Sequence, residues 1–261
     1  MQRAELDHTA GNGAGTAVVR DPLAEHATPP RPPGRVLVTG GASGLGAAIV
    51  EAVATRRGTP IVLDRQPPCD TDADVDFERV DLADARAAEQ AVERAIERHG
   101  GLDAVVTAAG TDSCGKLEDV SGEDWDRVVK VNLLGTAAVV RAALPALLQA
   151  ENPRVVTVAS TLGLRVLSDA TAYCASKFGV VGFSRALAVE LAGRVGVTML
   201  VPGGMRTHFF DGRDPLYQPP ADARLAPPEE VAAAVVFALE RPRGIELREL
   251  VVCPSEETSW P

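Results

Sequence analysis

The chain has 261 residues, of which 46% are hydrophobic and 24% are charged, which suits one large α/β domain with a substantial core. Its formal net charge of −10, with no basic run to offset it, argues against nucleic acid and anionic membranes as partners. No apolar run approaches the ~20 residues of a membrane span and no signal peptide is evident, so we expect no membrane segment. The four cysteines are scattered, which predicts no metal site, no disulfide and a cytoplasmic location.

Residues 1–34 differ from the rest of the chain in composition. The run 11–15 is rich in glycine, and the run 28–34 is rich in proline. We expect a flexible N-terminal arm over 1–34, with residues 35–261 forming one domain. Docking of Val18, Val19 and Leu23 on a neighbouring subunit is the alternative for this arm.

From Arg35 onward, short apolar runs alternate with longer helical patterns. The short runs are rich in β-branched residues without in/out alternation, as is typical of a parallel sheet buried on both faces. The alternation predicts a Rossmann-type, doubly wound, seven-stranded parallel sheet flanked by helices, with ligands at the carboxyl ends of the strands. The predicted strands are 36–38, 60–63, 77–80, 103–106, 155–158, 197–201 and 250–252, and the predicted helices are 44–57, 84–99, 122–150, 171–193 and 228–241.

A glycine-rich turn joins the first predicted strand to the first predicted helix. Gly40, Gly44 and Gly46 would let the backbone approach a phosphate, and the helix would direct its free N–H groups and positive end at a pyrophosphate. Because the glycines directly follow a strand and precede a helix, they predict a dinucleotide site. A turn without a ligand is the alternative.

Asp64 ends the second predicted strand, at about the 20-residue offset where an acid meets the adenosine ribose. A carboxylate there accepts from both ribose hydroxyls and repels a 2′-phosphate, so the sequence favours NAD(H) over NADP(H). Arg65 could receive that phosphate, and a turn acid without a ligand is the structural alternative. After the third strand, Asp81 and Leu82 could hold the adenine, although an Asp that opens the helix near 84 is the alternative.

Tyr173 and Lys177 are four residues apart and therefore share one face of a helix. A tyrosine with an ordinary pKa near ~10 is mostly the wrong species to act as a base at neutral pH. A nearby ammonium lowers such a pKa, so we predict that Tyr173 is the acid/base and that Lys177 lowers its pKa. Ser160, thirteen residues before Tyr173 at the end of a strand, would orient a substrate carbonyl or alkoxide. A solvated helix face is the alternative for the pair.

With these motifs in place, residues 35–253 resemble the compact single-domain branch of the short-chain dehydrogenase/reductase family. One departure is that Thr107 and Ala108 stand where the family usually has two asparagines. The resemblance implies that Asn132 takes part in a proton relay with Lys177, and that Lys177 also binds the nicotinamide ribose. The motifs that carry it are 39–46, 107–110, Asn132, Ser160, 173–177 and 202–207.

The predicted activity is NAD(P)(H)-dependent interconversion of a secondary alcohol and a ketone. The alternatives are a cofactor-binding regulator without turnover and a nucleotide-sugar epimerase or dehydratase, which shares the Tyr-x-x-x-Lys pair. The candidate catalytic residues are Ser160, Tyr173, Lys177 and Asn132, and the candidate cofactor-binding residues are Gly40, Ser43, Gly44, Leu45, Gly46, Asp64, Asp81, Leu82, Ala109, Gly110, Tyr173, Lys177, Pro202, Gly203 and Thr207.

Substrate choice is expected to lie in 112–114, in 162–164 and in a lid over 205–226. The aromatic residues of this lid favour a lipophilic alcohol or ketone, whereas Asp211, Arg213 and Asp214 allow a polyol or sugar equally. The predicted helices 122–150 and 171–193 are apolar beyond one face, which predicts a homodimer or homotetramer.

Overall fold

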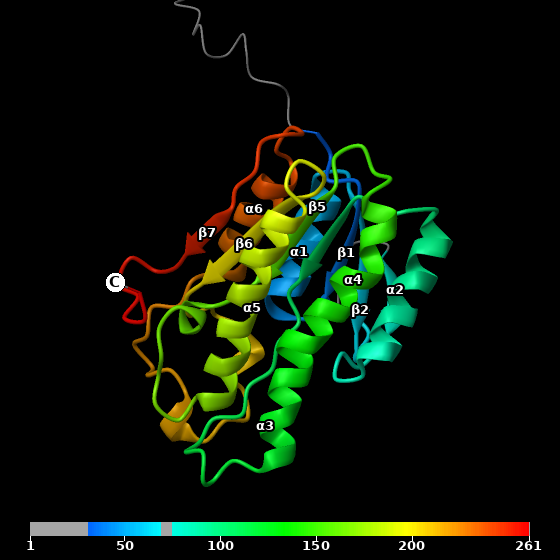
Figure 1. The fold of residues 1–261 in the computed structure, drawn as a ribbon. Coiled ribbons are helices and arrows are strands. Elements are labelled where there is room, and N and C mark those ends of the chain that lie inside the picture. Colours follow the sequence, from blue (N-terminus) through cyan, green and yellow to red (C-terminus); the bar gives the residue numbers. More distant parts are fainter. Residues whose placement is uncertain (1–30, 69–74, 261) are drawn as a thin grey trace, which may run out of the picture.

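Seven parallel strands form one sheet in the order β3-β2-β1-β4-β5-β6-β7 (Figure 1). The computed structural model describes residues 31–68 and 75–260, so most of the predicted N-terminal arm lies outside the described residues. The sheet confirms the predicted Rossmann-type, doubly wound architecture in a single domain. The strands are β1 (Arg35–Thr39), β2 (Thr59–Asp64), β3 (Asp76–Arg79), β4 (Ala104–Thr107), β5 (Arg154–Val158), β6 (Gly196–Pro202) and β7 (Glu249–Val252).

Helices cover both faces of this sheet. Along β1, Val36 and Val38 point to one face and Leu37 to the other, and all three are fully buried. Two apolar layers therefore need apolar residues at successive strand positions, which is why the strands show no alternation. The helices α1 (Gly44–Thr55) and α6 (Pro228–Leu239) pack on the face of Val36, and α2 (Ala85–His99), α4 (Thr136–Leu147) and α5 (Thr171–Glu190) pack on the face of Leu37 (Figure 1).

The predicted helix 122–150 is interrupted. It consists of α3 (Gly122–Val129), a π-helical turn over Lys130–Gly135 and α4. At Gly135 a Cβ would lie 2.8 Å from the carbonyl oxygen of Leu82, so the chain is held close to the loop after β3. Asn132, a poor helix former, lies in the π-helical turn and bonds outside the helix.

The same run also corrects the expectation about membrane-spanning length. Gly122–Leu147 is long and apolar enough to cross a membrane by length and composition, and half of its most apolar window is buried inside the fold. An apolar helix with this much buried surface is typical of a packed layer in a globular domain.

The order of the sheet reverses between β1 and β4, and the loops that follow these strands diverge there. The turn after β1 is tied to both neighbours. Gly40 N donates to Leu63 O at 2.9 Å, and Ala109 N donates to the Thr39 hydroxyl at 3.2 Å. In doubly wound sheets this crevice is where ligands bind, so the fold itself places a site at these loops.

Candidate active site

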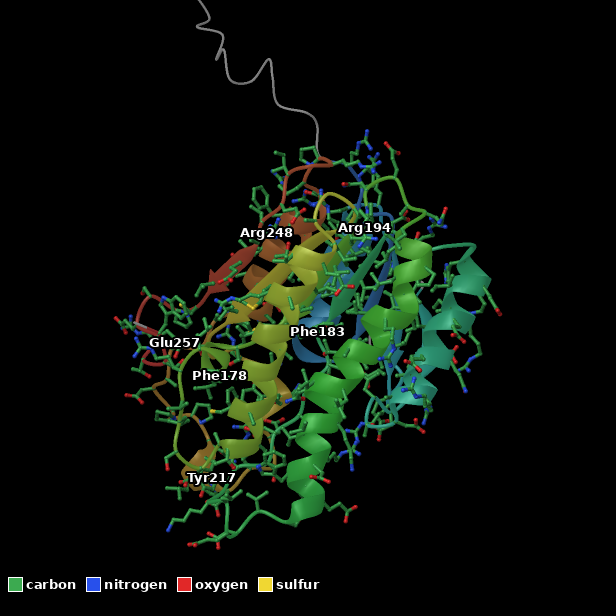
Figure 2. All side chains as sticks on the ribbon, viewed as in Figure 1. Phe178, Phe183, Arg194, Tyr217, Arg248 and Glu257 are labelled. Atoms are coloured by element: carbon green, nitrogen blue, oxygen red, sulfur yellow. The ribbon has the colours of Figure 1, made fainter. Side chains whose placement is uncertain are left out.

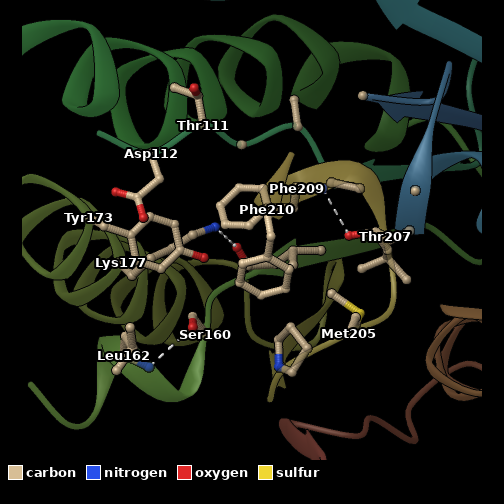
Figure 3. Close-up of a pocket in the computed structure, with 18 of the residues that line it drawn as sticks. Thr111, Asp112, Ser160, Leu162, Tyr173, Lys177, Met205, Thr207, Phe209 and Phe210 are labelled. Atoms are coloured by element: carbon tan, nitrogen blue, oxygen red, sulfur yellow. Dashed lines mark hydrogen bonds between the residues drawn. The ribbon is translucent and has the colours of Figure 1, made fainter. Parts of the chain in front are cut away.

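A cleft of about 1170 Å³ opens at the carboxyl ends of the strands. Its lining includes every predicted cofactor-binding residue, together with Ser160, Tyr173 and Lys177 (Figure 3). Asn132 does not line this cleft and lies behind it, with 1% of its surface exposed. The strand-end loops thus bring together residues that are up to 167 positions apart, from Gly40 to Thr207.

The glycine turn fits a phosphate group because side chains cannot occupy it. Gly40 has a φ of +71°, and a Cβ there would lie 2.7 Å from the Cα of Ala109. A Cβ on Gly46 would lie 2.0 Å from the carbonyl oxygen of Gly40. Ser43 caps α1 with its backbone only, since its hydroxyl makes no capping bond. Gly44, Leu45 and Gly46 at the N-terminus of α1 line the cleft. The first backbone N–H groups of a helix have no partner within the helix, which suits the binding of an anion such as a pyrophosphate.

Asp64 stands at the end of β2 and lines the cleft beside this turn. Its Oδ2 accepts from Ala42 N and its Oδ1 accepts from Gln66 N, each at 3.1 Å. Arg65 lines the same part of the cleft and is exposed. The carboxylate therefore ties the end of β2 to the glycine turn.

Asp81 is already engaged within the protein. Its Oδ1 accepts from Ala83 N and its Oδ2 accepts from the Arg127 guanidinium, both at 2.9 Å. Burial alone would raise the pKa of Asp81, but these two donors hold it below its ordinary value. Helix α2 is opened by Asp84, whose side chain accepts from Arg86 N and Ala87 N, so Asp81 is not the helix cap.

Lys177 lies on α5 one turn after Tyr173 and is 4% exposed. Its ammonium group donates to the carbonyl oxygen of Val158 at 2.9 Å and lies 5.6 Å from the centre of the Tyr173 ring (Figure 3). Burial lowers the pKa of Lys177 to about 8. The cation is therefore fixed at the end of β5, beside the aromatic ring.

The pKa of Tyr173 shifts in the direction opposite to the sequence prediction. Burial raises it, and a hydrogen bond with Ser160 acts against this increase without cancelling it. The Lys177 ammonium donates to Val158 O, and its charge does not offset the effect of burial on Tyr173. In this structure the residues of the site alone keep Tyr173 protonated at neutral pH.

Ser160 lies at the carboxyl end of β5 and is 8% exposed. Its hydroxyl accepts from Leu162 N at 3.1 Å, which fixes the start of the following helical turn, and Ser160 also acts to lower the pKa of Tyr173. The structure thus brings the two hydroxyl groups and the Lys177 ammonium to one place in the cleft.

Asn132 connects elements rather than facing the cleft. Its Oδ1 accepts from Thr111 N at 2.8 Å, and its Nδ2 donates to Thr111 O at 2.9 Å and to the Ser176 hydroxyl at 3.0 Å. Ser176 in turn donates to the carbonyl oxygen of Tyr173 at 2.8 Å. Both N–H bonds of the Asn132 amide are therefore used to join the loop after β4 to the first turns of α5.

Thr207, in the loop after β6, lies against the glycine turn. A Cβ on Gly44 would lie 3.3 Å from the Cβ of Thr207, and the Thr207 hydroxyl accepts from Phe209 N at 3.3 Å. Pro202 ends β6, and Gly203 N donates to Val252 O at 3.0 Å. The loop after β6 is thereby held between α1 and β7.

The C-terminal segment also borders the cleft, which the sequence analysis missed. Glu257, labelled in Figure 2, accepts from Gly204 N at 2.8 Å. The Ser259 hydroxyl donates to the Thr161 hydroxyl at 2.7 Å. No motif marks these residues, because only the folding back of the chain after β7 brings them to the site. Within the part of the chain that the structure describes, no cluster of His, Cys, Asp or Glu could hold a metal ion.

Comparison with known proteins gives consistent results. The family profile described as "short chain dehydrogenase" matches residues 35–215. The D-threitol dehydrogenase of Mycolicibacterium smegmatis is 36% identical, over 77% of this chain and 84% of its own length. The solved structure of an aldohexose dehydrogenase from Thermoplasma acidophilum has a TM-score of 0.75 and 26% identity, covering 84% of this chain and 92% of its own. A short chain dehydrogenase from Burkholderia cenocepacia, solved in complex with NADP, has a TM-score of 0.72 and 27% identity, with 85% and 96% of the two chains covered.

Proposed function

Because the chain belongs to the short-chain dehydrogenase family, and so is an oxidoreductase that uses an NAD(P) cofactor, we propose that it interconverts a secondary alcohol and a ketone. The observation that carries this proposal is the convergence of Ser160, Tyr173 and Lys177 at one point of the cleft lining. A regulator that only binds the cofactor has no need of this arrangement.

The proton path runs through Tyr173. In the oxidation direction the phenolate oxygen of Tyr173 takes the hydroxyl proton of the alcohol. The hydrogen on the carbon that bears this hydroxyl leaves as hydride, so that a ketone and a neutral Tyr173 result. When bound, the oxidised nicotinamide supplies the hydride acceptor and a positive charge that favours the phenolate. Ser160 holds the oxygen of the substrate, and Lys177 holds the ribose and adds positive charge near the ring.

We propose that Asn132 acts by positioning other residues of the site. Its amide fixes Thr111 and, through Ser176, the backbone of Tyr173. A Cβ on Gly110 would lie 3.6 Å from Asn132 Oδ1 and 3.8 Å from Lys177 Nζ, so both residues border the same point behind the cleft. We propose that a water bound at this point connects Lys177 with Asn132 in a proton relay.

Replacing Tyr173 with Phe tests the proton path. We expect the variant Tyr173→Phe to lose alcohol oxidation by about 100-fold or more, because removal of a general acid/base costs roughly that factor. The matched measurement is a fluorescence titration with NADH, which should give a dissociation constant close to that of the unaltered enzyme. Turnover near the normal rate would refute the role of Tyr173.

We further propose that the cofactor is NAD(H) rather than NADP(H). Support comes from the Asp64 carboxylate at the adenosine end of the cleft, since a second anion beside it is unfavourable. The NADP bound to the Burkholderia cenocepacia relative makes the phosphorylated cofactor the competing candidate.

Titration with NADH and with NADPH decides between them. We expect tighter binding of NADH, and we expect Asp64→Asn to move the ratio of the two dissociation constants toward NADPH by about tenfold or more. The exposed Asp222→Asn, which lies outside the cleft lining, removes the same charge as a control and should leave the ratio unchanged. Tighter binding of NADPH to the unaltered enzyme would contradict the proposal.

We propose a homodimer or homotetramer in the cytoplasm. Large apolar side chains that are exposed on this chain support assembly. Among them are two on α5, Phe178 at 43% exposure (labelled in Figure 2) and Val189 at 75%. Eleven positions apart, the two lie on the same side of the helix.

A further inference from the structure

The cleft contains a charged pair that the proposed chemistry does not use. Asp112, in the loop after β4, has a side chain that is 7% exposed, and Arg213, in the segment after β6, has one that is 15% exposed. Their closest atoms, Asp112 Oδ2 and Arg213 Nη2, are 3.2 Å apart. Both residues line the cleft together with Ser160 and Tyr173, and Figure 3 shows Asp112 beside the Tyr173 ring.

The Asp112 carboxylate accepts two hydrogen bonds from residues of its own loop. Its Oδ1 accepts from Ser113 N at 2.7 Å and its Oδ2 accepts from the Cys114 thiol at 3.3 Å. Burial, together with Asp112, raises the pKa of the Cys114 thiol to about 11, so the thiol stays protonated and remains a donor. The carboxylate is therefore anchored as an acceptor at a defined place in the cleft.

The guanidinium of Arg213 is positioned by aromatic rings rather than by hydrogen bonds. Its central carbon lies 4.7 Å from the centre of the Phe209 ring and 4.8 Å from that of Phe210. Among the described residues, Nη2 is buried without a hydrogen-bond partner, so its contact with Asp112 is an ion pair without hydrogen-bond alignment. A buried donor without an acceptor is rare in folded proteins and indicates that something else accepts from it.

Phe209 links this pair to the catalytic tyrosine. The centres of the Phe209 and Tyr173 rings are 5.7 Å apart, and Arg213 covers Phe209. Both charges also reach Tyr173, since Asp112 raises its pKa and Arg213 lowers it, although both effects are smaller than that of burial. The pair therefore lies beside the place where the reacting carbon of a substrate would be.

The chemistry of the pair selects one class of substrate. A hydroxyl group is both donor and acceptor, so a single hydroxyl can donate to Asp112 and accept from Arg213 Nη2. A carboxylate or phosphate would meet the fixed charge of Asp112, and an amine would meet that of Arg213. An apolar ketone would exclude water from both groups and satisfy neither.

We propose that Asp112 and Arg213 are specificity-determining residues that bind a hydroxyl other than the one oxidised, so that the substrate is an uncharged polyol or its keto form. This inference rests on the proposed alcohol oxidation and names its substrate class. It assigns the charged residues of the lid segment to substrate recognition, while the aromatic residues Phe209 and Phe210 hold the guanidinium in place.

The first experiment uses the unaltered enzyme with NAD and four-carbon alcohols that differ in hydroxyl number: 2-butanol, 2,3-butanediol, 1,2,3-butanetriol and erythritol. We expect kcat/KM to be about 10- to 100-fold higher for the best polyol than for 2-butanol, the factor that a hydrogen bond to a charged group provides. If 2-butanol is used as well as or better than every polyol, the inference is overturned. If an enzyme that binds NADH oxidises none of them, the inferred polyol class is overturned as well, whereas failure to bind NADH or NADPH would refute the proposed function itself.

The second experiment removes each charge separately. We expect Arg213→Met and Asp112→Asn to lower kcat/KM for the polyol about 10- to 100-fold while changing that for 2-butanol by less than about threefold. The controls Arg243→Met and Asp126→Asn remove the same charges from exposed positions outside both the cleft lining and the lid segment, and they should change neither value. Equal losses for 2-butanol and the polyol would overturn the inference, because a merely structural role affects both. Titration with NADH reports whether each variant folds, and if Arg213→Met does not, the substrate series on the unaltered enzyme decides.

Discussion

The burial of Lys177, to which we propose a role in the chemistry, lowers the stability of the fold. Its ammonium is buried beside Tyr173 with one hydrogen bond, to Val158 O. Burial lowers its pKa from 10.5 to about 8, so folding disfavours the charged form. Between these two values the unfolded chain binds the proton more strongly, and the stability contributed by this site therefore rises with pH. Below pH 8 the full destabilisation is present.

A substitution at Lys177 makes this effect measurable. We expect Lys177→Met to abolish turnover. We also expect the change that it causes in the free energy of unfolding to be about 2 kcal/mol more stabilising at pH 6.5 than at pH 9.5. Comparison of the two pH values cancels the loss of the bond to Val158 O, which does not depend on pH. The control is Lys116→Met at an exposed lysine, for which denaturant titration should show no such difference. The same stability change at both pH values would contradict the lowered pKa.

Sequence spacing predicted that Tyr173 and Lys177 share a helix face, because this depends only on helical geometry. It did not predict that the ammonium turns toward Val158 O or that the pKa of Tyr173 rises. These properties depend on how deeply α5 is buried against β5, and burial is a property of the folded chain. The position of Arg213 over Phe209 and Phe210 likewise depends on how the segment after β6 folds over the cleft.

At the scale of elements, the glycine turn and α1 depend on close backbone contact. We expect Gly46→Ala to lower the free energy of unfolding by about 2–4 kcal/mol and to weaken NADH binding, because its Cβ would lie 2.0 Å from Gly40 O. Gly122, the first residue of α3, has no atom within 4 Å of such a Cβ. Gly122→Ala should therefore change the free energy of unfolding by less than about 0.5 kcal/mol. Thermal melting of both variants measures these changes. Equal melting temperatures for the two variants would show that the turn can widen.

The strands could be placed from the sequence to within a few residues, because a sheet buried on both faces requires continuous apolar runs such as Val36 to Val38. The interruption of the long helix could not. Asn132 was a local signal for it, but its cause is contact with Thr111, Ser176 and the loop at Leu82, which come from other parts of the chain.

At the scale of the whole molecule, exposed apolar residues on α5 predict assembly. We expect sedimentation at micromolar concentration to show a dimer or tetramer, and Phe178→Glu to shift it toward monomer, because an interface that buries an unpaired charge is strongly weakened. Leu117→Glu introduces the same charge at a residue that is 64% exposed in the loop before α3, and it should leave the assembly unchanged. A monomer for the unaltered protein would contradict the expectation.

The bond between Asp64 and the glycine turn limits how this protein could be re-engineered. The carboxylate that would exclude a 2′-phosphate also accepts from Ala42 N, so a substitution that admits the phosphate and removes this acceptor also loosens the loop that should hold the pyrophosphate. The coenzyme preference that we propose and the rigidity of this loop would therefore depend on the same residue. A variant redesigned for the other coenzyme would need a compensating acceptor for the Ala42 amide before it regained full affinity.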